Sequence, residues 1–132
     1  MKPVVCVDVD GVLADYSQGW KGIDNIGDPI VGKDGELGAV DFTKELAKIA
    51  DVLIYTTRCT EELNHNLKAH LLKNIMRGWL DKHSFVYHEI FTGQGKPIAS
   101  AFIDDKGISC RPQQEANAYS RVLSQFVQLI KR

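Results

Sequence analysis

Four short runs of apolar residues divide this chain, and each has the length of a β-strand. The runs are rich in β-branched and aromatic side chains, which favour strands, and charged or turn-forming residues follow them. They cover residues 4–9, 52–55, 85–91 and 101–103. The pattern predicts four strands, of which the first two are buried.

Three helices are predicted from the amphipathic stretches of the chain. The first covers residues 42–50, with Asp41 as its N-cap. The second runs from an N-cap at Thr60 to about residue 80, and its expected core-facing stripe is Leu63, Leu67, Leu71, Ile75 and Trp79. The third follows Arg111 and Pro112, and its expected buried face is Ala116, Tyr119, Leu123, Phe126 and Ile130.

The order of these elements predicts the fold class. Strands that alternate with helices imply βαβ crossovers and therefore a mainly parallel sheet. We expect an α/β fold, a Rossmann-like three-layer sandwich, formed by residues 1–132 as a single domain. Residues 16–38 are rich in glycine and turn signals, which predicts a loop with at most a small hairpin. Residues 14–40 are therefore expected to form a flap rather than a second domain.

Polar residues stand where several predicted strands end. Asp8 and Asp10 belong to the end of the first strand, Thr56 follows the second, and Asp104 with Asp105 follows the last. In an open parallel sheet, ligands bind at the carboxyl ends of the strands. These side chains are therefore expected to converge on one edge of the sheet, although they are far apart in sequence.

The segment Asp8-Val9-Asp10-Gly11 is the sharpest of these signals. Two carboxylates at the end of an apolar strand are costly to bury unless a cation neutralises them, and carboxylate oxygens suit magnesium. An ordinary strand-end turn explains Asp10-Gly11 well, because glycine lets the backbone turn sharply. Such a turn does not explain Asp8, an acid between valines, and the pair therefore favours a functional site.

The remaining polar residues are open to two interpretations each. Asp104-Asp105 could be a solvated turn, or it could complete a metal site with the first acidic pair. Lys96 could be a surface charge, or it could bring its ammonium to the edge of the sheet. Thr56 could be a simple strand residue or could donate to a phosphate oxygen, and Arg58 could lie on the surface or clamp the same anion.

Together these segments resemble the four motifs of the haloacid dehalogenase superfamily, in the right order. They read VVCVDVDGV, VLIYT, GKP and AFIDD, and they span residues 4–105. The resemblance implies that Asp8 attacks phosphorus, and that Asp10 protonates the leaving group and later activates water. It also implies that Thr56 and Lys96 hold phosphoryl oxygens. Magnesium would be bound by Asp8, Asp10, Asp104 and Asp105, with Asp105 favoured over Asp104 as the direct ligand, although the two could exchange.

An aspartate at position 10 narrows the expected reaction. Members of this superfamily that are dehalogenases, phosphonatases or ion pumps usually lack it, so the resemblance implies a magnesium-dependent phosphatase or phosphotransferase. A positioned acid of this kind contributes typically about 10²–10⁴-fold in rate. Thr57, Arg58 and Gly11 are candidates for contacts with the phosphate.

No sizeable cap domain is expected, because residues 14–40 can supply only a flap. The site is then open unless an oligomeric partner covers it. The substrate could be a small phosphorylated metabolite, a nucleotide or another terminal phosphate. Tyr16, Trp20 and Lys21 of the flap are candidates for contacts with its leaving group.

Composition excludes several other classes of protein. The formal net charge of −1 leaves no basic excess for generic nucleic-acid binding. The three cysteines make no metal-binding or disulfide pattern, and no apolar run approaches the length of a membrane span. A cytoplasmic protein without membrane contacts is expected.

Two rival functions fit parts of the pattern. A phospho-receiver domain also combines acids, a threonine, a lysine and magnesium, but it would need an acceptor aspartate on a middle strand. The strand at residues 52–55 ends in threonine instead. A non-catalytic relative that only binds a phosphate or a partner is the other rival, and no feature of the sequence favours it.

Overall fold

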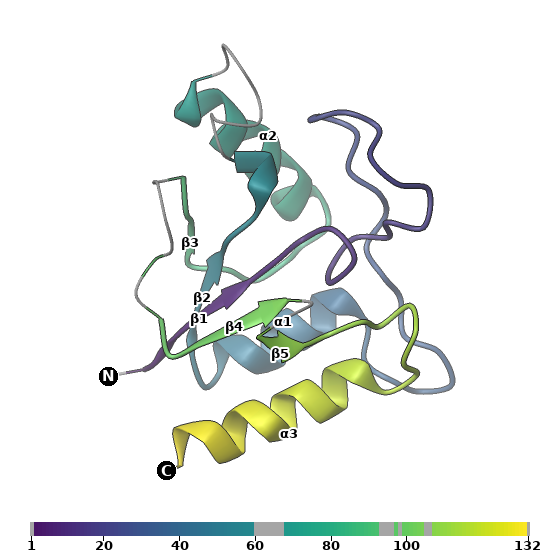
Figure 1. Ribbon diagram of the computed structural model, residues 1–132, viewed down its shortest axis with the longest axis vertical. Coiled ribbons are helices and arrows are strands. Elements are labelled where there is room, and N and C mark those ends of the chain that lie inside the picture. Colours follow the sequence, from purple (N-terminus) through teal and green to yellow (C-terminus); the bar gives the residue numbers. More distant parts are fainter. Residues whose placement is uncertain (1, 60–67, 93–96, 98, 105–106, 132) are drawn as a thin grey trace.

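The computed structural model describes residues 2–59, 68–92, 97, 99–104 and 107–131. The elements follow one another as β1 (Val4–Val7), α1 (Ala39–Ala47), β2 (Asp51–Ile54), the 3₁₀ turn η1 (Thr57–Cys59), α2 (Ala69–Lys82), β3 (Glu89–Ile90), β4 (Ala101–Asp104), β5 (Ile108–Ser109) and α3 (Ala118–Ile130). Figure 1 shows these helices arranged around a single sheet. The fold is therefore α/β, as the alternation of elements predicts.

All five described strands are parallel, in the order β3-β2-β1-β4-β5. β1 is the central strand, with Val7 paired to Ile54 of β2 on one side and to Ile103 of β4 on the other. The chain moves outward from β1 through β2 to β3, and then returns to the opposite side of β1 for β4. The carboxyl ends of β1 and β4 therefore form the switch point of the sheet, where open α/β sheets bind ligands.

Two predicted strands are too long. The first ends at Val7, and the run at residues 85–91 contributes only Glu89–Ile90 to the sheet. The backbone N–H groups of Phe85 and Val86 donate to the Leu80 carbonyl and to Thr43 Oγ1, at 3.0 and 3.3 Å. Because these donors bond to helices α2 and α1, this part of the run does not join the ladder. β5 was not predicted.

The predicted N-cap of the first helix is wrong. Helix α1 begins at Ala39, and its N-cap is Gly38, whose carbonyl accepts the N–H of Phe42 at 2.9 Å. Asp41 lies in the first turn instead, where a carboxylate suits the positive end of the helix dipole. The chain enters α1 directly from the flap, because the N–H of Ala39 donates to the Ile30 carbonyl at 2.8 Å.

The stripe predicted for the second helix is displaced by one position. Helix α2 buries Leu72, Met76 and Leu80, whereas Leu71 is 43% exposed. Both sets have helical spacing, and packing against the sheet selects the second. The described part of the helix begins at Ala69, so the predicted N-cap Thr60 and the stripe residues Leu63 and Leu67 lie outside the described residues.

Helix α3 buries a face close to the predicted one. Tyr119 and Phe126 are buried as expected, together with Ala118 and Val122. Ala116 precedes the helix and is exposed, and Ile130 is 36% exposed at its end, so these two assignments are wrong. The Tyr119 ring stacks on Phe42 of α1 with 4.7 Å between ring centroids, which joins α3 to α1.

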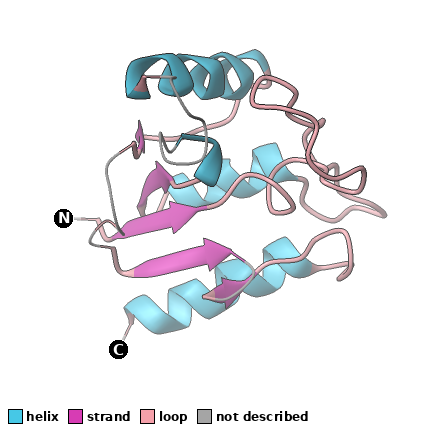
Figure 2. Ribbon diagram, turned by 45° about the horizontal axis from the view of Figure 1, so that its top comes forward, coloured by secondary structure: helices cyan, strands magenta, loops and turns pink. Residues whose placement is uncertain are grey.

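Residues 14–38 form a long loop over the carboxyl ends of the strands. Its two arms pair through backbone hydrogen bonds, from Asp15 to Asp28 and from Ile30 to Leu13, at 2.8 and 2.9 Å. Figure 2 shows β1 and β4 pointing toward the region where the loops gather. Among the helices of the described residues, none is long and apolar enough to cross a membrane.

Candidate active site

Asp8 and Asp104 lie on neighbouring strands at the switch point. The backbone N–H of Asp8 donates to the Ile103 carbonyl at 3.1 Å, which continues the β1–β4 ladder past the last paired residue. Both side chains line a cavity of about 160 Å³ together with Thr57, which follows β2. The convergence expected from the strand ends is therefore present for Asp8 and Asp104, and Thr57 joins them in place of the predicted Thr56.

Asp10 is positioned by a tight turn. Gly11 has a φ of +79°, a conformation that side-chain-bearing residues rarely adopt. The carbonyl of Val9 accepts three backbone N–H groups, from Val12, Leu13 and Ala14, at 2.8–3.1 Å. The chain thus turns back immediately after Asp10, and the carboxylate of Asp10 stays beside the end of β1.

Arg58 neutralises Asp10. Its Nε donates to Asp10 Oδ2 at 2.7 Å, and the arginine side chain is only 2% exposed. A buried carboxylate needs a counter-charge close by, and the turn η1 supplies one. Arg58 is therefore not a surface residue, and its predicted role as a clamp on phosphate stays a prediction. The other oxygen, Asp10 Oδ1, is buried and has no hydrogen-bond partner among the described residues.

The two threonines that follow β2 differ in their surroundings. Thr56, the residue predicted to hold phosphate, is 4% exposed, and its Oγ1 accepts the backbone N–H of Arg58 at 3.3 Å. Thr57 is exposed and lines the cavity that contains Asp8. Thr57 is thus the threonine that shares a cavity with Asp8.

Two predicted site residues, Lys96 and Asp105, lie outside the described residues. Asp104 Oδ1 accepts the backbone N–H of Gly107 at 2.5 Å, and this bond leads the chain into β5. Within the described ranges, no cluster of three or more His, Cys, Asp or Glu could hold a metal. Mg²⁺ needs fewer protein ligands, because it is commonly held by one or two carboxylates together with water and substrate phosphate. The carboxylates of Asp8 and Asp104, and the unpaired oxygen of Asp10, fit that donor set.

A larger groove opens on the other side of Asp8. Its volume is about 590 Å³, and Asp8, Asp10 and Gly11 form one wall. The groove is also lined by Arg111, Gln113 and Gln114, which follow β5. These three residues were not predicted as part of a site, because nothing in their local sequence marks them. They lie there through contacts between distant parts of the chain.

Gln113 joins this segment to the flap. Its Nε2 donates to Asp15 Oδ1 at 2.9 Å, and its Oε1 accepts the backbone N–H of Tyr16 at 3.1 Å. The side chain and backbone of Ser17 also donate to Asp15, and these hydrogen bonds hold the pKa of the Asp15 carboxyl below its usual value. The start of the flap is thereby fixed beside the groove.

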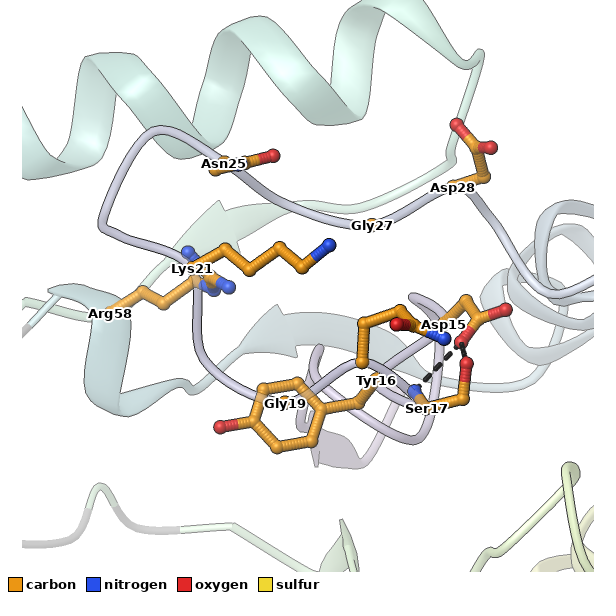
Figure 3. Close-up of a pocket in the computed structure, with 10 residues that line it drawn as sticks. Asp15, Tyr16, Ser17, Gly19, Lys21, Asn25, Gly27, Asp28 and Arg58 are labelled. Carbon is orange, nitrogen blue, oxygen red and sulfur yellow. Dashed lines mark hydrogen bonds between the residues drawn. The ribbon is translucent and has the colours of Figure 1, made fainter.

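The flap residues predicted to contact a substrate occupy different places. Tyr16 lines both the groove beside Asp8 and a second cavity of about 280 Å³ within the flap. Lys21 extends into this second cavity, as Figure 3 shows. Trp20 instead covers Arg58, whose guanidinium carbon lies 4.5 Å from the indole centroid. Tyr16 is thus the flap side chain of the three that lines the groove with Asp8 and Asp10.

Comparison with known proteins bears on the fold alone. No protein-family model matches the chain, and no curated protein matches it. A crystal structure of a target protein from Vibrio cholerae is similar over 99% of this chain and 98% of that chain, with 24% identity and a TM-score of 0.50. At this identity the likeness extends to the α/β architecture, and the function has to be inferred from the site itself.

Proposed function

We propose that this chain is a magnesium-dependent phosphohydrolase of the haloacid dehalogenase type, which cleaves a phosphate monoester through an aspartyl-phosphate on Asp8. The observation that carries the proposal is the place of Asp8. It directly follows the central strand at the switch point and borders an open groove, and Asp10 follows on the turn made by Gly11. We further propose that the chain folds as a three-layer sandwich of the haloacid dehalogenase type and has no sizeable cap domain over its active site.

The proposed reaction has two displacements at phosphorus. Asp10 first takes up a proton from solvent. A carboxylate oxygen of Asp8 then attacks phosphorus, the bond to the ester oxygen breaks, and Asp10 gives its proton to the departing alkoxide. Asp10 then takes a proton from water, whose oxygen attacks the same phosphorus and releases inorganic phosphate and the free Asp8 carboxylate. Splitting the reaction in this way eases each step.

The surrounding residues would bind the transferred group and its counter-ion. Asp8 and Asp104 would hold Mg²⁺, which neutralises charge on the phosphoryl oxygens when it is bound. The Thr57 hydroxyl is the donor that we assign to a phosphoryl oxygen, because it shares a cavity with Asp8. The resemblance assigns Lys96 and Asp105 to the same phosphoryl and metal contacts.

The groove suggests the size and polarity of the leaving group. A volume of about 590 Å³ is larger than a phosphate needs and falls within the range typical of ligand sites. Its lining includes Arg111, Gln114 and Tyr16, which are residues with polar or aromatic side chains. A polar leaving group of the size of a small metabolite or a nucleoside fits these properties.

A phospho-receiver finds no support in the strand order. Receiver domains such as CheY have the order 2-1-3-4-5, whereas β1 here lies between β2 and β4. A receiver would moreover need an acceptor aspartate on a middle strand. The residue that follows β2 and lines the cavity with Asp8 is Thr57, which carries a hydroxyl instead of a carboxylate.

The test is phosphate release from a panel of phosphate esters, with and without Mg²⁺, for wild type, Asp8→Asn and Asp41→Asn. We expect Mg²⁺-dependent turnover that falls on the order of 10³-fold or more in Asp8→Asn, because the nucleophile is lost. Asp41 is an exposed acid on α1 and serves as the matched control, with activity unchanged. Equal activity in Asp8→Asn and wild type would refute the mechanism.

A further inference from the structure

Among the described residues, Arg58 is the largest side chain that is almost completely buried, and its guanidinium connects three parts of the chain. Its Nε binds Asp10 Oδ2 at 2.7 Å. Its Nη1 donates to the flap carbonyls of Gly22 and Ile23 at 2.8 and 3.1 Å. The Trp20 ring covers it at 4.5 Å, so that the flap contacts Arg58 through both its backbone and an aromatic face.

Each of these contacts restricts the others. A buried guanidinium must keep its donors paired, because an unpaired buried charge is costly. If the flap segment at residues 20–23 moves away, two acceptors and the aromatic cover are lost, and the arginine must move or become hydrated. The arginine cannot move without changing its bond to Asp10. The position of the flap and the orientation of the Asp10 carboxylate are therefore coupled.

The coupling acts on the carboxylate that the proposed reaction uses for proton transfer. Asp10 Oδ2 is held by Arg58, and Oδ1 is enclosed without a partner among the described residues. Among the described residues, Arg58 therefore donates the hydrogen bond that fixes the Asp10 carboxylate. A small rotation of this carboxylate would misplace the proton relative to an ester oxygen in the groove.

We propose that Arg58 is a positioning residue, which orients Asp10 for proton transfer to the leaving group and makes that orientation depend on closure of the flap over Arg58. The inference rests on the proposed function. It assigns to Arg58 no contact with phosphate, and it assigns to Trp20 and the carbonyls of Gly22 and Ile23 the task of holding Arg58.

A positioning role predicts a defect that depends on the leaving group. An alkyl phosphate departs as a poor leaving group and needs the proton of Asp10, whereas p-nitrophenolate leaves without one. General-acid catalysis contributes typically about 10²–10⁴-fold, and this contribution should be lost only where a proton is needed. A merely structural role would lower the rates of both esters together.

The experiment compares kcat/KM for p-nitrophenyl phosphate and for an alkyl phosphate such as glycerol phosphate. This quantity reports formation of the aspartyl-phosphate and leaves out its hydrolysis, in which Asp10 would act as base for both esters. Arg58→Lys keeps the charge and loses the paired geometry and the stacking on Trp20. We expect kcat/KM for the alkyl ester to fall on the order of 10²-fold and kcat/KM for p-nitrophenyl phosphate to change less than about 5-fold. Arg77→Lys, at an exposed arginine of α2, is the matched control and should leave both rates unchanged.

Trp20→Ala keeps the test decisive if Arg58→Lys does not fold. The Trp20 side chain is 53% exposed, so its removal costs little stability, and it weakens only the flap side of the arrangement. We expect the ratio of kcat/KM for p-nitrophenyl phosphate to kcat/KM for the alkyl ester to rise severalfold. Equal losses on both esters in a folded variant would overturn the positioning role. Wild type that hydrolyses neither ester, or an Asp8→Asn variant that hydrolyses both, would instead overturn the proposed function.

Discussion

Tyr119, on α3, forms a hydrogen bond with the turn that follows Asp10. Its hydroxyl donates to the Val12 carbonyl at 2.5 Å, and the side chain is 3% exposed. Tyr119→Phe removes this donor and leaves the aromatic ring, so the stacking on Phe42 and the packing of the core are kept. The variant therefore isolates one hydrogen bond between α3 and the turn that follows β1.

The size of the effect follows from what remains after the substitution. The Val12 carbonyl would stay buried without this partner, which costs about 1–3 kcal/mol. An unfolding entropy of about 2.1 cal/mol/K per residue gives roughly 280 cal/mol/K for 132 residues. Tyr119→Phe should therefore lower the Tm by about 4–11 °C.

Thermal unfolding followed by circular dichroism measures this difference. Tyr87→Phe is the matched control, since the Tyr87 hydroxyl donates to Asp81 at 2.8 Å in an exposed pair, and its loss should cost no more than about 0.5 kcal/mol. A Tm for Tyr119→Phe equal to that of Tyr87→Phe would show that the bond to Val12 does not hold the turn.

Two further predictions concern the buried thiols and the glycines. Burial raises the pKa of all three cysteines, to about 11 for Cys6 and Cys59 and to about 12 for Cys110. Above pH 9 the unfolded chain loses the thiol protons while the native protein keeps them. The free energy of unfolding should therefore fall by up to about 1.4 kcal/mol per pH unit for each thiol. Urea unfolding at pH 7.5, 9 and 10 measures this slope, and a free energy that does not change with pH would contradict the prediction. Gly27→Ala should destabilise the flap, because the added methyl group would overlap the Asp15 carbonyl oxygen. Gly78 lies on α2 with open space around it, so Gly78→Ala should raise the free energy of unfolding by about 0.5–1 kcal/mol. Chemical denaturation of both variants tests the opposite signs.

The sequence was sufficient for the features that local pattern determines. Alternating apolar and amphipathic segments predicted the parallel sheet, and acids at strand ends predicted that Asp8 and Asp104 would meet. The register of α2 could not be predicted, because Leu71 and Leu72 begin two stripes with the same spacing. Only packing against the sheet distinguishes them, and this information is not local.

The buried position of Arg58 and the contacts of Gln113 could not be predicted from the sequence for a related reason. Asp10 required a counter-charge, but several cations could have supplied it, and 48 positions separate it from Arg58. Gln113 reaches Asp15 across 98 positions, and no local motif marks either residue. Contacts of this kind depend on the finished fold, because the flap and the segment after β5 become neighbours only when the sheet is complete.

The central place of β1 has a consequence for the order in which the protein can fold during synthesis. Val5 pairs with Val52 of β2 and with Ala101 of β4, so its second neighbour lies 101 − 5 = 96 positions later in the chain. At about 5–20 residues per second, the ribosome needs roughly 5–20 s to supply it. Throughout that interval the strand that carries Asp8 has an unpaired edge on its β4 side. Nascent chains that stop before β4 should therefore be the species that aggregate or bind chaperones, and the site is completed only when the last third of the chain has emerged.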